Sequence, residues 1–267
     1  MQAQPMMTFP NPSAEEVETV DAICAKHGAY KARVVDLTDI GGRKLTMSCP
    51  QCSQDARDAE AARKVAEAEG QRRHKVAALN YAAGIPVRFQ TRRLENYRHD
   101  LPGQKRALNV ARRFVDSWPE QREKGTSLIF TGGPGTGKTH LACAISSALM
   151  DGHLASVCFG TVLELLRTVK DTYRKDSPRT ETEAIADLLR YDLLILDEVG
   201  VQIGSEHEKN LLFEILNGRY QDCLPTILLS NLNAADLEAF LGQRVMDRYR
   251  ECGAVVAFDW QSHRGTK

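Results

Sequence analysis

Residues 132–139 of this chain read Gly132-Gly133-Pro134-Gly135-Thr136-Gly137-Lys138-Thr139. They fit the phosphate-binding pattern G-x-x-x-x-G-K-[ST] at every fixed position. A short apolar run at 127–131 precedes this loop, and a segment rich in Ala, Leu and Ile follows it at 140–150. Strand, glycine loop and helix in this order form the context in which the pattern binds phosphate. The alternative is a glycine turn before an ordinary helix, which the eight matching residues disfavour.

The residue types in this loop explain why it would bind a nucleoside triphosphate. Glycines let successive backbone N–H groups turn towards one anion, and the following helix adds the positive end of its dipole. Lys138 is predicted to reach the β- and γ-phosphates. The Thr139 hydroxyl is predicted to complete the coordination of Mg²⁺.

Composition places the chain among ordinary globular proteins. It has 267 residues, of which 42% are hydrophobic and 26% charged, and its formal net charge is zero. Nucleic-acid binding would therefore depend on local patches. No apolar run approaches the roughly 18–20 residues that span a bilayer, and residues 1–12 lack the features of a secretory signal. An odd count of seven cysteines favours reduced thiols, so we expect a cytoplasmic protein without a membrane partner.

Two short metal-ligand motifs lie near the N-terminus. Cys24 and His27 form one C-x-x-[CH] pair, and Cys49 and Cys52 form a second. Together they supply the four ligands of a closed tetrahedral zinc site. Between them, 30–37 and 43–47 are predicted to form a hairpin with its turn at 39–42, which makes a zinc ribbon. A helix is expected before it, from Ser13 to Ala22; the alternative for the motif is four unrelated residues.

The pattern of composition predicts three parts. Residues 1–52 form the zinc-ribbon-like domain, 53–84 a charged helical arm, and 85–267 the nucleotide-binding domain. The arm has few large apolar residues, so it is expected either to connect the domains or to lay a narrow face on a partner. Its basic cluster at 72–75 is interpreted as a solvated face.

Two further strand ends carry polar side chains suited to ATP chemistry. Four aliphatic residues at 193–196 are followed by Asp197 and Glu198, as expected of a buried parallel strand that ends at a ligand site. Asp197 is predicted to hold Mg²⁺, and Glu198 to orient and deprotonate the attacking water. Asn231 ends the strand at 226–230 and could contact the γ-phosphate or that water, although a simple turn residue is the common alternative.

Two helices carry candidate cationic residues. The predicted helix 161–174 ends in a basic group that includes Lys170, Tyr173 and Arg174. Positive charge beside an aromatic ring suits single-stranded DNA, but cations at a helix end also complement the helix dipole, and the residues alone do not separate the two. Arg244 and Arg248 lie on one face of a later helix at i and i+4.

The order of these motifs resembles the AAA+ ATPases and, more narrowly, the DnaC family of replicative helicase loaders. The resemblance covers about residues 85–267 and is carried by the phosphate loop and by four further stretches, 170–174, 197–202, 244–248 and 259–264. It implies an α/β fold with an AAA+ core, in which a five-stranded parallel sheet has helices on both faces. It also implies an ATPase that loads a hexameric replicative helicase onto single-stranded DNA.

The resemblance assigns roles to individual residues. Asn231 would be the sensor-1 residue, Arg244 the arginine finger inserted into a neighbouring subunit's site, and Arg248 a second candidate finger. Arg264 would sense nucleotide from the tail, and Lys170, Tyr173 and Arg174 would contact single-stranded DNA. The zinc ribbon departs from the best-known cellular loaders and is familiar in phage and prophage relatives, so a phage-type loader is expected.

Two rival functions remain open on the sequence. An IstB-type transposition ATPase would share the core but work with a transposase on duplex DNA. A nucleotide-switched zinc adaptor would bind partners with little turnover, and Glu198 together with Arg244 argues against it.

Overall fold

A computed structural model describes residues 18–38, 42–201 and 205–263 of the chain. Contacts divide the chain into two compact units, Met1–Gln71 and Arg72–Lys267. Helix α1 (Pro50–Ala82) begins in the first unit and ends in the second. The predicted domain boundaries near residues 52 and 84 stay predictions.

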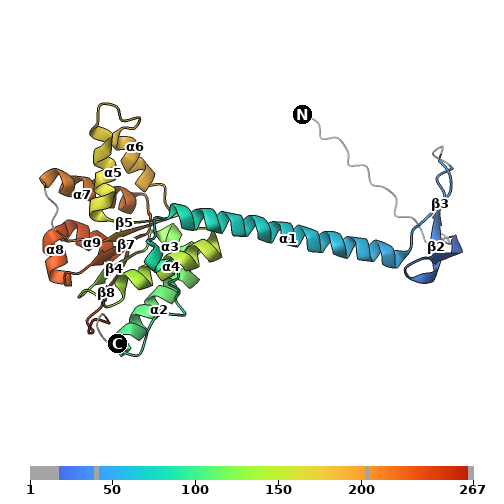
Figure 1. Cartoon of the computed structure of the whole chain (residues 1–267), viewed down its shortest axis with the longest axis horizontal. Coiled ribbons are helices and arrows are strands. Elements are labelled where there is room, and N and C mark those ends of the chain that lie inside the picture. The colour runs from blue at the N-terminus through green and yellow to red at the C-terminus, as the bar shows by residue number, and fades with distance from the viewer. Residues whose placement is uncertain (1–17, 39–41, 202–204, 264–267) are drawn as a thin grey trace, which may run out of the picture. The chain divides into compact units, whose positions relative to one another are not determined.

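The first unit contains a three-stranded antiparallel sheet of order β1-β2-β3, shown in blue in Figure 1. Its strands are β1 (Thr19–Cys24), β2 (Gly28–Val35) and β3 (Leu45–Thr46). The predicted pairing of two strands between the cysteine motifs is present, with Val34 opposite Thr46. The predicted helix 13–22 is wrong over 19–22, because these residues pair with β2 from Thr19 opposite Arg33 onwards. Residues 13–17 and most of the predicted turn, 39–41, lie outside the described residues.

Helix α1 is polar on all sides, as its composition predicts. Within Pro50–Ala82 no residue is buried. Intrahelical ion pairs at i and i+4, such as Lys64 with Glu60 at 2.8 Å, support such a helix. Neither α1 nor any other helix of the described residues is both long and apolar enough to cross a membrane.

The second unit is built on a five-stranded sheet of order β5-β6-β7-β4-β8, in which every neighbouring pair is parallel. The predicted fold class is confirmed. Parallel strands buried on both faces favour continuous aliphatic runs, and β6 and β7 read this way. The strand bounds are β4 (Ser127–Thr131), β5 (Val157–Thr161), β6 (Leu193–Asp197), β7 (Thr226–Ser230) and β8 (Gly253–Ala257).

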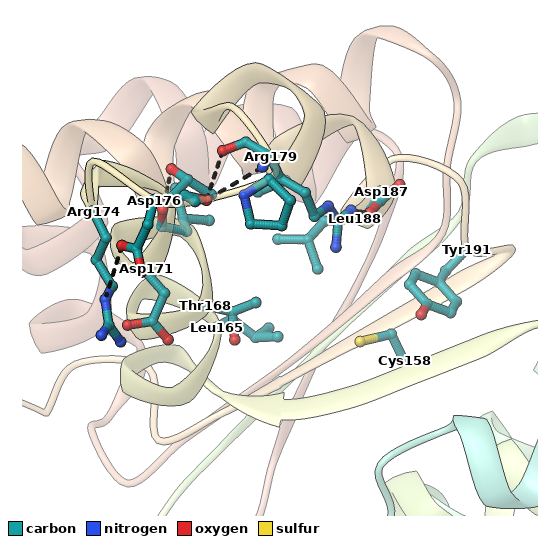
Figure 2. Close-up of a pocket in the computed structure, with 15 residues that line it drawn as sticks. Cys158, Leu165, Thr168, Asp171, Arg174, Asp176, Arg179, Asp187, Leu188 and Tyr191 are labelled. Atoms are coloured by element: carbon teal, nitrogen blue, oxygen red, sulfur yellow. Dashed lines mark hydrogen bonds and ion pairs between the residues drawn. The ribbon is translucent and has the colours of Figure 1, made fainter.

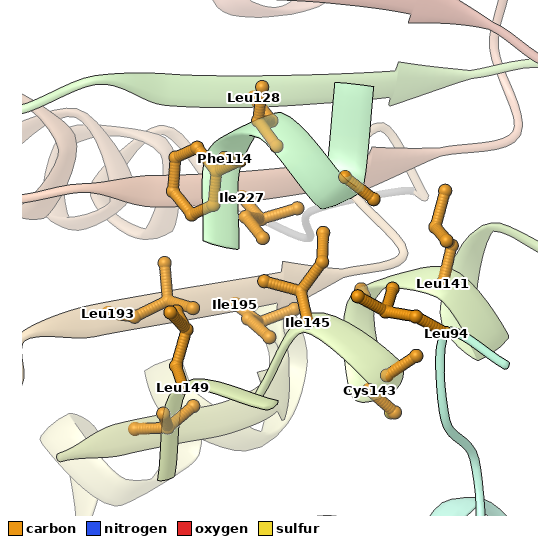
Figure 3. Packing of buried hydrophobic residues seen from close by; sticks show 14 of the residues in the cluster. Leu94, Phe114, Leu128, Leu141, Cys143, Ile145, Leu149, Leu193, Ile195 and Ile227 are labelled. Carbon is orange, nitrogen blue, oxygen red and sulfur yellow. The ribbon is translucent and has the colours of Figure 1, made fainter. Parts of the chain in front are cut away.

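Helices cover both faces of this sheet (Figure 1). Alternate strand residues point to opposite sides, so Leu193 and Ile195 join one core while Leu194 and Leu196 join the other. The first core packs against α2 and α4 (Figure 3), and the second packs against α5 to α9. The bounds are η2 (Val87–Phe89), α2 (Pro102–Asp116), α3 (Trp118–Lys124), α4 (Lys138–His153), α5 (Val162–Lys170), η3 (Asp171–Tyr173), α6 (Glu181–Leu188), α7 (Glu206–Gln221), α8 (Ala234–Leu241) and α9 (Gln243–Glu251).

Candidate nucleotide-binding site

The phosphate loop connects the end of β4 to the start of α4, as its sequence predicts. Gly132 and Gly137 have φ angles of 130° and 99°, a backbone conformation that other residues rarely adopt. A Cβ atom at Gly132 would lie 2.2 Å from the Phe258 carbonyl oxygen. Because Gly137 is the N-cap of α4, the start of this helix faces the loop. The arrangement has the backbone freedom and the helix dipole that bind a phosphate.

Lys138 connects the loop to the neighbouring strand. Its side chain is buried, and its ammonium donates to the Gly132 and Gly133 carbonyl oxygens at 2.6 and 2.8 Å. The same ammonium donates to Oδ1 of Asn231 at 3.0 Å, at the end of β7. The predicted phosphate-binding lysine and the predicted sensor residue therefore lie side by side.

Thr139 and Asp197 also meet, across the ends of α4 and β6. The Thr139 hydroxyl donates to Oδ2 of Asp197 at 3.0 Å. Burial raises the pKa of Asp197 above its ordinary value, although the Glu198 backbone N–H, the Thr139 hydroxyl and the Lys138 charge oppose this effect. Hydroxyl and carboxylate oxygens are the donors that Mg²⁺ prefers, so these two residues fit the predicted metal site.

Glu198 follows Asp197 with a φ of 60°, a left-handed conformation that is uncommon for a residue with a side chain. Its backbone N–H donates to Oδ1 of Asp197 at 2.8 Å, and the next N–H, of Val199, donates to the Leu229 carbonyl at 2.9 Å. The chain is thus held in a sharp turn that leaves the Glu198 side chain exposed beside Asp197. Backbone strain of this kind is concentrated at functional sites.

The structure adds contacts that sequence reasoning missed. The indole N–H of Trp260 donates to the Thr136 carbonyl at 2.9 Å, and the backbone N–H of His263 donates to the Gly135 carbonyl at 3.0 Å. Tyr97 lies on the loop as well, since a Cβ at Gly137 would be 3.2 Å from its ring. The only sequence signal was the presence of aromatic residues before the loop helix and after the last strand.

The candidate arginines differ in their surroundings. Arg248 donates to the Asn217 side chain and lies over the Tyr220 ring, 5.2 Å from its centroid. Arg244 lies at the exposed start of α9, and among the described residues it has no hydrogen bond or ion pair. Arg264 lies outside the described residues, so its predicted role has no structural counterpart here.

The predicted DNA-binding residues lie at the end of α5, in η3 and directly after η3, and each has an acidic side chain as a partner. Lys170 forms an ion pair with Glu208 at 2.9 Å. The Tyr173 hydroxyl donates to Glu181 and lies 2.7 Å from Nε2 of His207. Arg174 is exposed, with Asp176 at 3.9 Å.

A cavity of about 540 Å³ lies beside Arg174, between α5, α6 and β5 (Figure 2). Cys158 and Tyr191 line one part of it, and Arg174 and Arg179 line another. It is separate from the phosphate loop, because no residue of the loop lines it.

The four predicted zinc ligands come together in the first unit. Their ligand atoms, from Cys24, His27, Cys49 and Cys52, all lie within 4.8 Å of one another. The Cys24 and Cys52 sulfurs are 3.4 Å apart, and Nδ1 of His27 lies 3.3 to 3.8 Å from the three sulfurs. Tetrahedral ligands at about 2.3 Å from a zinc ion would be about 3.8 Å apart, so the geometry fits this metal.

The environment of the cluster also favours a metal. The backbone N–H groups of Lys26 and His27 lower the pKa of Cys24 and so favour its thiolate, the form that binds zinc, while the hydrogen bond to Cys24 raises the pKa of Cys52. On the other side of the imidazole, Nε2 of His27 lies 3.2 Å from Oδ2 of Asp55. A carboxylate on the second ring nitrogen is the usual support of a histidine ligand.

Taken together, the phosphate loop of β4, the acids that end β6 and the asparagine that follows β7 define a P-loop ATPase of the AAA+ class. The chain belongs to the family of IstB-like ATP binding proteins, whose family model matches residues 53–262. The resemblance to AAA+ loaders predicted from the sequence is confirmed.

Comparison with individual proteins gives the same relationship. The chain is 40% identical over 184 residues to the replicative helicase loader DnaC of Escherichia coli (strain K12), covering 68% of this chain and 73% of that protein. The crystal structure of the DnaC helicase loader matches with a TM-score of 0.59 at 27% identity, covering 64% of this chain and 99% of that one. The crystal structure of DnaI matches with a TM-score of 0.56 at 25% identity, over 68% and 95%.

Proposed function

We propose that this chain uses ATP to load a hexameric replicative helicase onto single-stranded DNA in the cytoplasm. The observation that carries the proposal is its 40% identity, over 184 residues, to a replicative helicase loader. The convergence of Lys138, Asn231, Thr139 and Asp197 at the ends of adjacent strands supports ATP as the source of free energy.

ATP would bind with its phosphates against the backbone N–H groups of residues 132–139. Lys138 would exchange its contacts with loop carbonyls for contacts with the β- and γ-phosphates, which are stronger because both partners are then charged. Thr139 and Asp197 would hold Mg²⁺, which neutralises charge on the phosphates when bound. Glu198 would orient and deprotonate the attacking water, while Asn231 would contact the γ-phosphate from the end of β7.

Arg244 would complete the site of a neighbouring subunit. An exposed guanidinium without a partner in the described chain is available to a second copy, whereas Arg248 is already bound to Asn217 and Tyr220. We therefore favour Arg244 as the finger and keep Arg248 as the second candidate. A finger supplied in trans raises turnover by several powers of ten, which would make hydrolysis depend on self-assembly.

Lys170, Tyr173 and Arg174 would contact single-stranded DNA. Base stacking needs an accessible ring, and the Tyr173 side chain is about half exposed. DNA phosphates would compete with Glu208 for Lys170 and with Asp176 for Arg174. DNA binding at this helix end should consequently be sensitive to salt.

The cluster of Cys24, His27, Cys49 and Cys52 would hold a structural zinc ion in a ribbon domain of residues 1–52. Residues 53–84 would form the arm to the ATPase domain of residues 85–267. Either the ribbon or the arm would contact the helicase, in agreement with a phage-type loader.

The family model also favours a second candidate, because it is named for IstB-like proteins. In that case the ATPase would act with a transposase on duplex DNA.

One experiment separates these functions. Co-purification of the chain with a hexameric helicase of its own organism should require ATP and should be lost in Lys138→Ala. Lys124→Ala, in an exposed ion pair with Glu120, is the matched control and should bind the helicase normally. Capture by a transposase with no helicase complex would reject the loader proposal.

A further inference from the structure

The segment that follows β8, residues 258–263, runs along the outside of the phosphate loop. At its start, the Phe258 N–H donates to the carbonyl of Thr131, the last residue of β4, at 2.7 Å. At the far end, Trp260 and His263 donate to the Thr136 and Gly135 carbonyls at 2.9 and 3.0 Å. We infer that this segment, here called the loop strap, holds the phosphate loop in its anion-binding conformation and thereby sets the affinity for ATP.

The chemical reason lies in the orientation of peptide groups. A loop that binds an anion must point successive N–H groups inward, and this requires several carbonyl groups to point elsewhere. An unpaired carbonyl favours conformations in which it finds a donor, because buried backbone polar groups are costly when unsatisfied. The indole N–H of Trp260 and the backbone N–H of His263 satisfy two of these carbonyls from outside the loop.

The strap is itself held in place by the core and by α2. The Trp260 ring lies 4.8 Å from the Phe258 ring, which in turn lies 5.1 Å from the Phe130 ring of β4. A Cβ at Gly103, in the first turn of α2, would lie 2.9 Å from the Trp260 ring. The half-buried indole therefore has little freedom to leave the loop.

Gln104 fixes the other end of the strap. This side chain is 1% exposed, and its amide nitrogen lies 2.9 Å from Nε2 of His263. Its amide oxygen accepts a hydrogen bond from the Leu101 N–H at 3.0 Å, so α2 and the strap share one buried side chain. Because a buried polar side chain must satisfy its hydrogen bonds, Gln104 favours one defined position of the strap.

This inference rests on ATP binding alone and not on helicase loading, so it is tested on the isolated chain. Trp260→Phe keeps an aromatic ring at this position but removes the donor to Thr136. His263→Pro removes the backbone donor to Gly135 and also the imidazole that contacts Gln104, whereas His263→Ala removes only the imidazole, so the difference between these two variants measures the backbone donor. Because each loss is one hydrogen bond to the loop, ATP–Mg²⁺ binding should be about fivefold weaker in Trp260→Phe than in the wild type, and about fivefold weaker in His263→Pro than in His263→Ala. Turnover at saturating ATP should stay within about twofold of the wild type, because the strap acts through the loop and not on the reacting atoms.

A control at the other tryptophan separates this role from a general loss of stability. The chain has two tryptophans, and Trp118 packs against Phe114 in the core with ring centroids 5.6 Å apart. Trp118→Phe should bind ATP as the wild type does, and it leaves Trp260 as the sole tryptophan, whose fluorescence can be excited selectively at wavelengths beyond the absorption of tyrosine. Its emission should then change on addition of ATP–Mg²⁺, with a midpoint equal to the dissociation constant.

Three results would overturn the inference. The first is equal ATP affinity in Trp260→Phe, His263→Pro and the wild type. The second is equal weakening by Trp118→Phe and Trp260→Phe, and the third is equal weakening by His263→Ala and His263→Pro. A failure of helicase binding in these variants would have no bearing on the outcome, because none of the measurements includes the helicase.

Discussion

The two units of this chain differ in how much apolar surface they bury, and so in what can stabilise them. In the ATPase unit, β4 and β7 are buried along their whole length between two layers of helices. Among the described residues before α1, only Ala32 and Cys49 are buried, and the Ile23 side chain is 87% exposed. Apolar burial can stabilise the first arrangement but not the second. The small sheet therefore needs another source of free energy, and its ligand cluster offers one.

Loss of a zinc ligand should have the largest effect on stability of all the changes considered. This effect should be confined to the first unit. Structural zinc supplies on the order of 10 kcal/mol to a small domain, so Cys49→Ser should unfold the sheet of β1 to β3. ATP binding at the phosphate loop should persist, because its core lies in the second unit. Hydrogen exchange of the two units and metal analysis would measure both effects.

The matched control for this prediction is Cys223→Ser, since Cys223 is an exposed cysteine outside the cluster. It should keep one zinc ion per chain. A folded β1–β3 sheet without bound metal would contradict the zinc assignment.

The stability of the ATPase unit depends on the buried side chain of Arg219. This side chain is fully buried and donates to the carbonyls of Leu188, Tyr191 and Pro225 and to the Thr226 hydroxyl, at 2.6 to 3.1 Å. Burial lowers the pKa of Arg219 to about 10, so it remains charged at neutral pH. Arg219→Met would leave several buried acceptors unpaired and should lower the free energy of unfolding by roughly 3 kcal/mol.

Chemical denaturation of the whole chain would measure this loss in the transition of the second unit. Arg190→Met is the control, because Arg190 is exposed and binds only Asp187, at 3.2 Å, among the described residues. Equal stability of the Arg219→Met and Arg190→Met variants would show that the buried guanidinium does not hold these segments together.

A smaller effect is expected from the support of the zinc ligand. Asp55 lies 3.2 Å from Nε2 of His27 and would fix the tautomer that presents Nδ1 to the metal. Asp55→Asn should weaken zinc affinity about tenfold without unfolding the sheet at saturating zinc. Competition with a chelator would measure the affinity. Asp58→Asn, one turn further along α1, should have no effect, and an unchanged affinity in Asp55→Asn would remove Asp55 from this role.

The same contrast explains what the sequence could predict. The phosphate loop and the aliphatic strands have local patterns, so the loop, the parallel sheet and the positions of Asp197 and Asn231 at strand ends followed from residues 127–231. The cysteine motifs predicted their own convergence, because the ligand spacing encodes it. Residues 19–22 were wrongly assigned to a helix. They form a strand because they pair with β2, and the local sequence gives no information about this partner.

Contacts between distant segments were beyond sequence reasoning. Nothing in residues 258–263 indicates that Trp260 donates to Thr136, which lies far from it in the sequence, or that Gln104 contacts His263. Likewise, Arg244 is ranked above Arg248 as the candidate finger by family resemblance alone. The contacts of Arg248 with Asn217 and Tyr220 could not be predicted from the sequence.

The smallest effect on stability, and one of opposite sign, is expected at Asp197. Because burial raises its pKa, the folded chain holds a proton there more tightly than the unfolded chain does. The free energy of unfolding therefore falls as the pH rises above about 3.9, the ordinary pKa of an aspartate in the unfolded chain. The loss is complete once the pH exceeds the raised pKa of the folded chain. Asp197→Asn should raise the unfolding temperature of the nucleotide-free, Mg²⁺-free chain at pH 8, on the order of 2 °C.

This gain should shrink as the pH falls towards about 4 and vanish below about pH 3, where the wild-type carboxyl is protonated in both the folded and the unfolded chain. Addition of ATP–Mg²⁺ should stabilise the wild type more than the variant, because the variant lacks the carboxylate that would hold the metal. Asp222→Asn, at an exposed carboxyl after α7, should change neither measurement. A variant less stable than the wild type at pH 8 would mean that the Thr139 and Glu198 contacts outweigh the burial of the charge at Asp197.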